Sequence, residues 1–151
     1  MKRSRKKYEK PRKPWDKERL EREKELLKKY GLKRKKELWK AEAILRKYRR
    51  IARDLIVKKD AKKEKVLMEK LKDMGVLSGE PSLDDVLALT VEDILERRLQ
   101  TLVFRKGLAN SMKHARQLIT HGHVKIGDRK IVYPSYLVPK GEENEIKVEK
   151  V

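Results

Sequence analysis

Apolar residues recur at helical spacing through the first 90 residues, and this pattern predicts four helices before any strand. Asp16 is a good N-cap for the first helix, and Trp15 and Leu20 are placed to pack together as a hydrophobic staple. The apolar side of the second helix consists of Leu38, Trp39, Leu45, Ala52, Leu55 and Ile56. The four helices are expected over 17–29, 33–58, 61–74 and 83–89.

A fifth helix is expected after Thr90, because Thr90 and Asp93 have the spacing of a capping box. Its apolar side is formed by Leu95, Leu99, Leu102 and Val103. Arg97, Thr101 and Arg105 recur at i, i+4 and i+8, with Arg98 beside them, so the pattern predicts a polar, basic stripe on the other side.

The sixth helix has the clearest end signals. Ser111 is a good N-cap, and Gly107 and Gly122 stand where the fifth and sixth helices should end. Met112, Ala115, Leu118 and Ile119 fall on one face, and Lys113, Arg116, Gln117 and Thr120 fall on the other. Two helices packed through their apolar faces would leave both basic faces to solvent or to a polyanion.

The residues after the sixth helix predict short strands. Val124–Ile126 and Ile131–Val132 flank a Gly127–Asp128 turn, which indicates a tight hairpin. Further strands are expected over 136–138 and 145–148, joined by a turn at 141–144. The fold class is therefore α+β, with a mostly helical N-terminal part followed by two packed helices and a small antiparallel sheet.

Composition narrows the function. Of the 151 residues 38% are hydrophobic and 44% are charged, and the formal net charge of +19 favours a polyanionic partner. Nucleic acid is favoured over an anionic membrane surface as that partner. The sequence has no apolar stretch long enough to span a bilayer, and we expect no signal peptide. Cysteine is absent, which excludes disulfides, a thiol nucleophile and a cysteine zinc site.

The charge is concentrated at the N-terminus. Residues 1–60 carry a net charge of +16, residues 61–100 carry −2, and residues 101–151 carry +5. We expect 1–14 to be a flexible basic arm that becomes ordered on RNA, with a solubilising tail or a nuclear-localisation signal as alternatives. The second helix adds five cations within eight residues, for which a merely solvated face is the alternative. These five cations are Arg46, Lys47, Arg49, Arg50 and Arg53.

The sequence contains no recognisable motif for catalysis or for metal binding. His114, His121 and His123 are the only histidines, and no third ligand at a fixed spacing accompanies His121 and His123. No glycine-rich phosphate loop or nucleophile motif is present, and the acids near 84–93 fit helix N-termini. We therefore expect no enzyme activity, no metal and no cofactor.

The stretch RLQTLVFRKGLANSMKHARQLITHGHVKIGDRKIVYPSYLV resembles the S4-type RNA-binding domain. The family signature is carried by Arg98-Leu99, Gly107, Ser111, Ala115–Ile119, Gly122–Val124 and Gly127. The flanking KKYEKPRKPWDKERLEREKELLKKYGLKRKKELWKAE and LTVEDILERRLQT resemble small-subunit ribosomal protein S4 of the archaeal/eukaryotic type.

The resemblance implies a basic arm at 1–14, a helical ribosomal-protein region at 15–89 and an S4-type domain at 90–151. It implies a structural constituent of the small subunit of the cytoplasmic ribosome, which binds a junction of small-subunit ribosomal RNA early in assembly and neighbours other ribosomal proteins. No membrane and no small-molecule substrate are expected as partners. The expected RNA-binding residues are Arg97, Arg98, Arg105, Lys106, Ser111, Lys113, His114, Arg116, Gln117, Thr120, His121, His123, Lys125, Arg129 and Lys130, together with the five cations of the second helix.

Two alternatives stay open at this point. A pre-ribosomal RNA processing factor of the small nucleolar particle shares both the module and a basic N-terminal region, and a non-ribosomal regulator is a third class. The sequence has no cysteine and only four side-chain amides, and it is rich in Lys and Glu. This composition predicts a heat-tolerant, archaeal source.

Overall fold

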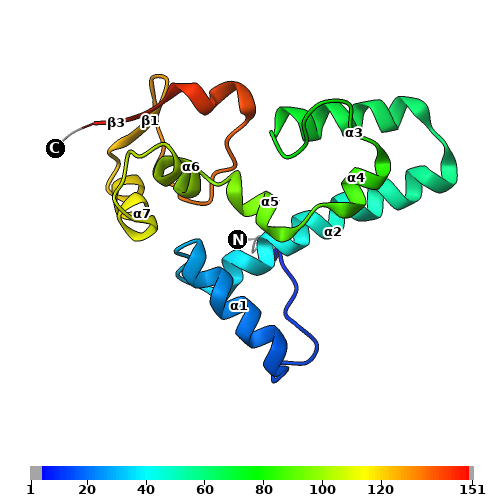
Figure 1. Cartoon of the computed structure of the whole chain (residues 1–151), viewed down its shortest axis with the longest axis horizontal. Coiled ribbons are helices and arrows are strands. Elements are labelled where there is room, and N and C mark those ends of the chain that lie inside the picture. The colour runs from blue at the N-terminus through cyan, green and yellow to red at the C-terminus, as the bar shows by residue number, and fades with distance from the viewer. Residues whose placement is uncertain (1–4, 150–151) are drawn as a thin grey trace.

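The computed structural model describes residues 5–149, and it is mostly helical with a small antiparallel sheet near the C-terminus (Figure 1). This confirms the α+β prediction. The helices are α1 (Lys17–Lys29), α2 (Lys35–Lys58), α3 (Ala61–Asp73), α4 (Leu83–Ala88), α5 (Val91–Glu96), α6 (Leu99–Arg105) and α7 (Met112–Thr120). The strands are β1 (Val124–Ile126), β2 (Arg129–Lys130) and β3 (Ile146–Val148), and a 3-10 helix, η1 (Lys140–Glu145), precedes β3.

Helix α2 is the longest element, and α1, α3, α4 and α5 lie along it (Figure 1). Asp16 and Asp60 cap α1 and α3 by accepting from the backbone N–H three residues on. The C-terminal half of α2 buries Leu45, Ala52 and Leu55 against α3 and α4 in one apolar cluster.

A second apolar cluster joins the start of α2 to α5. It contains Tyr30 and Leu32 after α1, Leu38 and Ala41 of α2, and Ile94 and Leu95 of α5. This cluster crosses the boundary expected at 89/90, because α5 packs on α2. The helical region and the C-terminal module are therefore in contact through buried apolar side chains.

The third cluster is the core of the C-terminal module, which consists of α6, α7 and the sheet. The sheet has the order β2-β1-β3 and is antiparallel, with Lys125 opposite both Lys130 and Lys147. Ser111 caps α7, and Gly107 and Gly122 follow α6 and α7 with φ of 72° and 81°. Glycine takes these left-handed angles without steric cost, so the predicted helix ends are confirmed.

The fifth predicted helix is broken in two, which corrects the sequence analysis. Arg97 and Arg98 lie between α5 and α6, and their backbone pairs with the 136–138 segment. The Leu99 N–H donates to the Tyr136 carbonyl at 2.7 Å, and the Val138 N–H donates to the Arg97 carbonyl at 2.9 Å. A backbone that pairs with an extended segment cannot continue a helix, so no stripe at i, i+4 and i+8 exists.

Smaller corrections follow from packing. The second hairpin strand is Arg129–Lys130 and not 131–132, and segment 136–138 forms only a single bridge, between Arg98 and Leu137. Residues 140–145 form η1, where a simple turn was expected. Trp15 is 89% exposed, so it does not form the predicted staple, and Ile56 and Val66 are also exposed.

Candidate nucleic-acid interface

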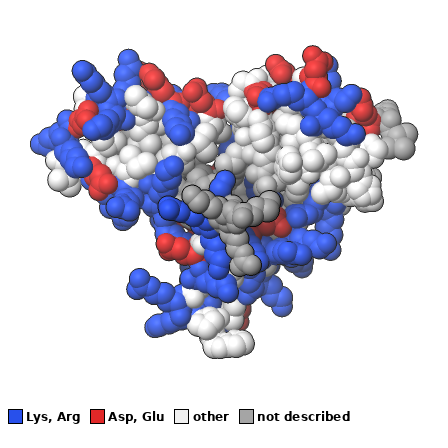
Figure 2. All heavy atoms as spheres, turned by 180° about the vertical axis from the view of Figure 1, so that it is seen from behind, with Lys and Arg blue, Asp and Glu red and all other residues white. Residues whose placement is uncertain are grey.

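Lys and Arg side chains cover much of the face seen in Figure 2, where Asp and Glu form small separate groups. The polyanion-binding surface has to be sought among these cations, and a cation that is already paired within the chain is less available for a phosphate. The ion pairs and hydrogen bonds of residues 5–149 therefore divide the predicted binding residues into two groups, those that are paired within the chain and those that are not.

The cations of α2 form the more open group. Arg46, Lys47, Arg50 and Arg53 are exposed, and only Arg46 has an acidic partner among the described residues, Glu9 at 3.0 Å. Arg49 differs, because its guanidinium donates to the Leu89 carbonyl and so fastens α2 to the end of α4. Lys47, Arg50 and Arg53 are defined here as the α2 cation set.

Helix α7 also presents an open face. Lys113, Gln117 and Thr120 are exposed as predicted, while Ala115 and Ile119 are fully buried. The Thr120 hydroxyl donates to the Arg116 carbonyl at 3.0 Å. This face therefore offers Lys113 and Gln117 as donors without a side-chain partner in the described chain.

Ser111 and His114 serve the start of α7. The Ser111 hydroxyl accepts from the His114 N–H at 3.1 Å, and His114 Nδ1 accepts from the Asn110 N–H at 3.2 Å. At the other end, the rings of His121 and His123 lie 6.3 Å apart. Among residues 5–149 no group of three or more metal-ligating side chains is found.

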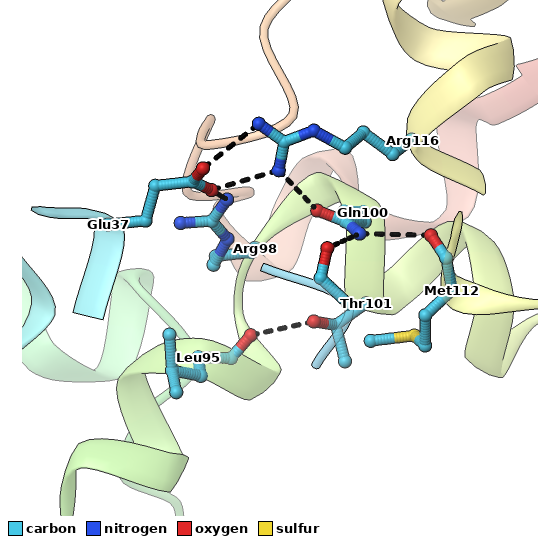
Figure 3. A network of polar contacts seen from close by, with 8 residues as sticks. Glu37, Leu95, Arg98, Gln100, Thr101, Met112 and Arg116 are labelled. Carbon is cyan, nitrogen blue, oxygen red and sulfur yellow. Dashed lines mark hydrogen bonds and ion pairs between the residues drawn. The ribbon is translucent and has the colours of Figure 1, made fainter. Parts of the chain in front are cut away.

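Arg98 and Arg116 meet on one carboxylate, that of Glu37 in α2 (Figure 3). Arg98 Nη2 donates to Glu37 Oε2 at 2.8 Å, and both Nη atoms of Arg116 donate to Glu37, at 2.9 and 3.0 Å. Only 6% of the Arg98 side chain is exposed. The prediction that Arg98 lies on an exposed basic face is therefore wrong.

Gln100 extends this network from α6. Its amide nitrogen donates to the Gly31 carbonyl at 3.1 Å and to the Met112 carbonyl at 2.9 Å, while its side-chain oxygen faces Arg116 (Figure 3). Gly31 has φ of +59°, and a Cβ there would lie 2.9 Å from the Gln100 nitrogen. Thr101 is 1% exposed and donates to the Leu95 carbonyl at 2.9 Å, which also removes it from the expected stripe.

Electrostatics explains why Glu37 stays ionised. Burial by itself raises the pKa of Glu37, but the guanidinium groups of Arg116 and Arg98 outweigh that effect and hold the pKa below its ordinary value. Burial lowers the pKa of Arg98, and Glu37 partly offsets it. A carboxylate shared by two arginines gives hydrogen bonds of the strong, charge-assisted kind.

Most of the other cations that were predicted to bind RNA in the C-terminal module are paired as well. Arg97 is bound to the Val138 carbonyl at 2.8 Å and to Glu143 at 3.0 Å, with 12% of its side chain exposed, so it too is internal. Exposed pairs join Arg105 to Glu96 at 2.8 Å, and Arg129 to Glu142 at 2.6 Å. Lys106 donates to the Glu143 carbonyl, and Lys125 pairs with Glu149. Lys130 has no acidic partner in the described chain, and its side chain passes over Gly122.

The predicted arm lies partly outside the described residues, which exclude 1–4. Residues 5–14 form no helix or strand, and the ring of Tyr8 lies 6.0 Å from that of Trp39 in α2. That the arm is mobile before it meets RNA stays a prediction.

Sequence reasoning missed Glu37 and Gln100. Glu37 is the only acid between Glu25 and Glu42, in a run rich in lysine and arginine, and that isolation was a usable signal. The sequence carries no such signal for Gln100, because its partners are backbone carbonyls that only the fold brings together.

Comparison with known proteins agrees with this geometry. The family model described as "S4 domain" matches residues 97–144, which contain α6, α7, β1 and β2, so the C-terminal module is of the S4-domain class. The chain is 50% identical to small ribosomal subunit protein uS4 of Korarchaeum cryptofilum over 97% of its own length and 89% of the relative's. It is 49% identical to the Ignicoccus hospitalis protein of that name, over 92% of this chain and 86% of the relative.

A third relative, uS4 of Picrophilus torridus, is 50% identical over 94% of this chain and 81% of its own length. The chain therefore belongs to the small ribosomal subunit protein uS4 family. These relatives come from archaea, which agrees with the archaeal/eukaryotic type of the resemblance. Within residues 5–149, no helix has both the length and the apolar character needed to cross a membrane.

Proposed function

We propose that this protein is a structural constituent of the small ribosomal subunit and that it binds ribosomal RNA directly. Membership of the uS4 family over nearly the whole chain is the observation that carries this proposal. The S4 domain at 97–144 and the net charge of +19 support it physically, because RNA is the polyanion of the ribosome. The role is structural and not enzymatic.

Binding rests on the cations that the fold leaves unpaired. A-form RNA hides its base edges in a deep, narrow major groove, so a rigid protein surface reads phosphates, 2′-hydroxyls and overall shape. The α2 cation set and Lys113 of α7 are placed on separate elements that the Glu37 network holds together. The α2 cation set and the α7 face around Lys113 can therefore contact two different RNA helices at once. A junction of several RNA helices offers such an arrangement, because its helices leave in different directions.

Helping to nucleate subunit assembly is the finer part of the proposal. A protein that contacts several helices of a junction stabilises their relative arrangement before later proteins bind. Neighbouring small-subunit proteins are its expected protein partners. The alternative of a pre-ribosomal processing factor is less favoured, because the relatives are named as subunit proteins.

A salt titration of binding to a small-subunit ribosomal RNA fragment tests the proposal. We expect log K to fall steeply with log[salt], by about 0.7–0.9 for each phosphate contact. The purified protein should also sediment with mature small subunits. A slope near zero, or sedimentation only with precursor particles, would contradict the proposed role.

A further inference from the structure

A cleft of about 490 Å³ lies where α2 faces the 134–137 segment of the C-terminal module. That volume falls in the range of small-molecule sites, roughly 300–1,000 Å³. Its lining includes the apolar residues Ala41, Ile44, Ile94 and Leu137, which are called the apolar wall below. The cleft therefore combines apolar lining residues with the charged Glu37, Arg98 and Arg116 network.

The charge around this cleft is positive. Glu37 offsets part of the charge of Arg98 and Arg116, and the Nε of Arg98 is buried without a hydrogen-bond partner in the described chain. Lys7 and Lys40 also line the cleft, are exposed, and have no ion pair there. An occupant with an anionic group and a flat apolar part would satisfy both kinds of wall.

A second cleft, of about 320 Å³, continues along α2 from the first. Lys7 lines both clefts, and the second adds Lys6, Arg46, Lys47 and Arg50 beside Tyr8, together with one acid, Glu9, which pairs with Arg46. Lys40 and Lys47 are seven residues apart, or about 10 Å along the helix axis. A flexible polyanion that occupied the first cleft would thus run directly into the second.

We propose that this pair of clefts binds an unpaired RNA strand, with one unstacked base in the first cleft beside Ser135. This proposal rests on the proposed RNA-binding function. Sequence-specific RNA recognition uses unstacked bases of single strands, which expose a π face and hydrogen-bonding edges. The base lies against Ile44 and Leu137, and its phosphates lie on Lys7 and Lys40. The Ser135 hydroxyl at the exposed rim donates to or accepts from the base edge.

A duplex does not fit these walls, because its base faces are stacked inside and it presents phosphates and 2′-hydroxyls, which do not use the apolar wall. A phosphate alone leaves the apolar wall unused. An acidic peptide matches the cations but has no flat apolar group for that wall. The unpaired nucleotide is therefore the occupant that uses both the charge and the apolar surface.

The test fills the cleft without changing charge. Ser135 is the third residue of a turn in which the Tyr136 N–H donates to the Tyr133 carbonyl at 3.1 Å, and its side chain is exposed, so Ser135→Trp keeps the turn. We expect at least a tenfold loss of affinity for the ribosomal RNA fragment, with an unchanged salt slope. Tyr133→Trp is the matched control, because Tyr133 is 68% exposed and does not line the cleft, and its affinity should stay within twofold.

Three results separate the outcomes. Wild-type affinity of Ser135→Trp would overturn the cleft proposal and leave the proposed function standing. If the unmodified protein does not bind the fragment at all, both proposals fall. A tenfold loss in Ser135→Trp alone, with circular dichroism melts equal to those of the control, supports the cleft.

Because the chain has no cysteine, Tyr133→Cys offers a single site for a fluorescent label, which is exposed, lies two residues from Ser135 and is not part of the cleft lining. The probes are a ten-nucleotide single strand of mixed sequence, the same strand annealed to its complement, the same backbone without bases, and a ten-residue polyglutamate. The label should respond to the single strand far more than to the other three. An equal response to the duplex, to the abasic strand or to polyglutamate would overturn the proposal.

Discussion

Helix α2 and the C-terminal module are both rich in Lys and Arg, but they use these residues differently. In α2, Lys47, Arg50 and Arg53 are exposed and have no acidic partner in the described chain. In the module, Arg97, Arg98, Arg105, Arg116, Lys125 and Arg129 are each paired with a glutamate. The same residue types are therefore left open to solvent in one region and mostly hold the protein together in the other.

The difference follows from where the acids lie. Residues 1–60 have a net charge of +16 and too few acids to pair with their cations, whereas Glu142 and Glu143 of η1 lie beside Arg129 and Arg97. A resemblance to an RNA-binding domain points first to the module's arginines. The structure instead gives several of them an internal partner, so the count of cations alone does not define the interface.

The largest effect on stability is expected for Glu37→Ala. It leaves the buried Arg98 without its acidic partner, and an unpaired buried charge costs about 3 kcal/mol of unfolding free energy. Chemical denaturation measures it. Glu149→Ala removes the exposed partner of Lys125 and is the control, for which no measurable change is expected. Equal losses in the two variants would show that the internal pairs are no stronger than surface pairs.

A smaller effect separates two neighbours on α7. Arg116→Ala removes the hydrogen bonds to Glu37 and should lower the unfolding free energy by about 1–2 kcal/mol, whereas Lys113→Ala should leave it unchanged and weaken only RNA binding. Thermal melts beside filter binding distinguish the two roles. If Lys113→Ala destabilises the fold as much as Arg116→Ala, the assignment of exposed and paired cations is wrong.

The smallest effect is a pH dependence. Because the pKa of Glu37 is lowered in the folded protein, its contribution to stability is present above the unfolded pKa of about 4.3 and is lost as the pH falls through the folded value. Glu37→Gln should therefore show a smaller loss of stability between pH 6 and pH 3 than the unmodified protein. Parallel curves for the two proteins would mean that Glu37 is not the titrating group.

Local patterns predicted much of this fold. The caps at Asp16, Thr90 and Ser111 and the glycines after α6 and α7 depend on neighbouring residues, so the helix ends could be read from the sequence. The break at Arg97–Arg98 could not, because it depends on pairing with residues about 40 positions later. Helical periodicity continues through that break and gave a false basic stripe.

The candidate site was predictable to a similar degree. The exposed faces of α2 and α7 follow from periodicity, and the structure confirms the exposure of their members except Arg49 and Arg116, which are half-buried and hydrogen-bonded within the chain. The pairing of Arg98 and Arg116 on Glu37 depends on contacts 61 and 79 residues apart in the chain. No spacing rule relates such residues, so the structure was needed to tell the paired cations from the open ones.

Comparing two triple variants on one ribosomal RNA fragment tests the central claim most directly. The first replaces Lys47, Arg50 and Arg53 by alanine, and the second replaces the paired Arg105, Lys125 and Arg129, of which Lys125 is half-buried and the other two are exposed. Both remove three positive charges, so net charge is matched. The account predicts a salt slope shallower by about 2–3 for the α2 variant and by less than about one for the paired variant. Equal changes in slope, or a larger change in the paired variant, would contradict it.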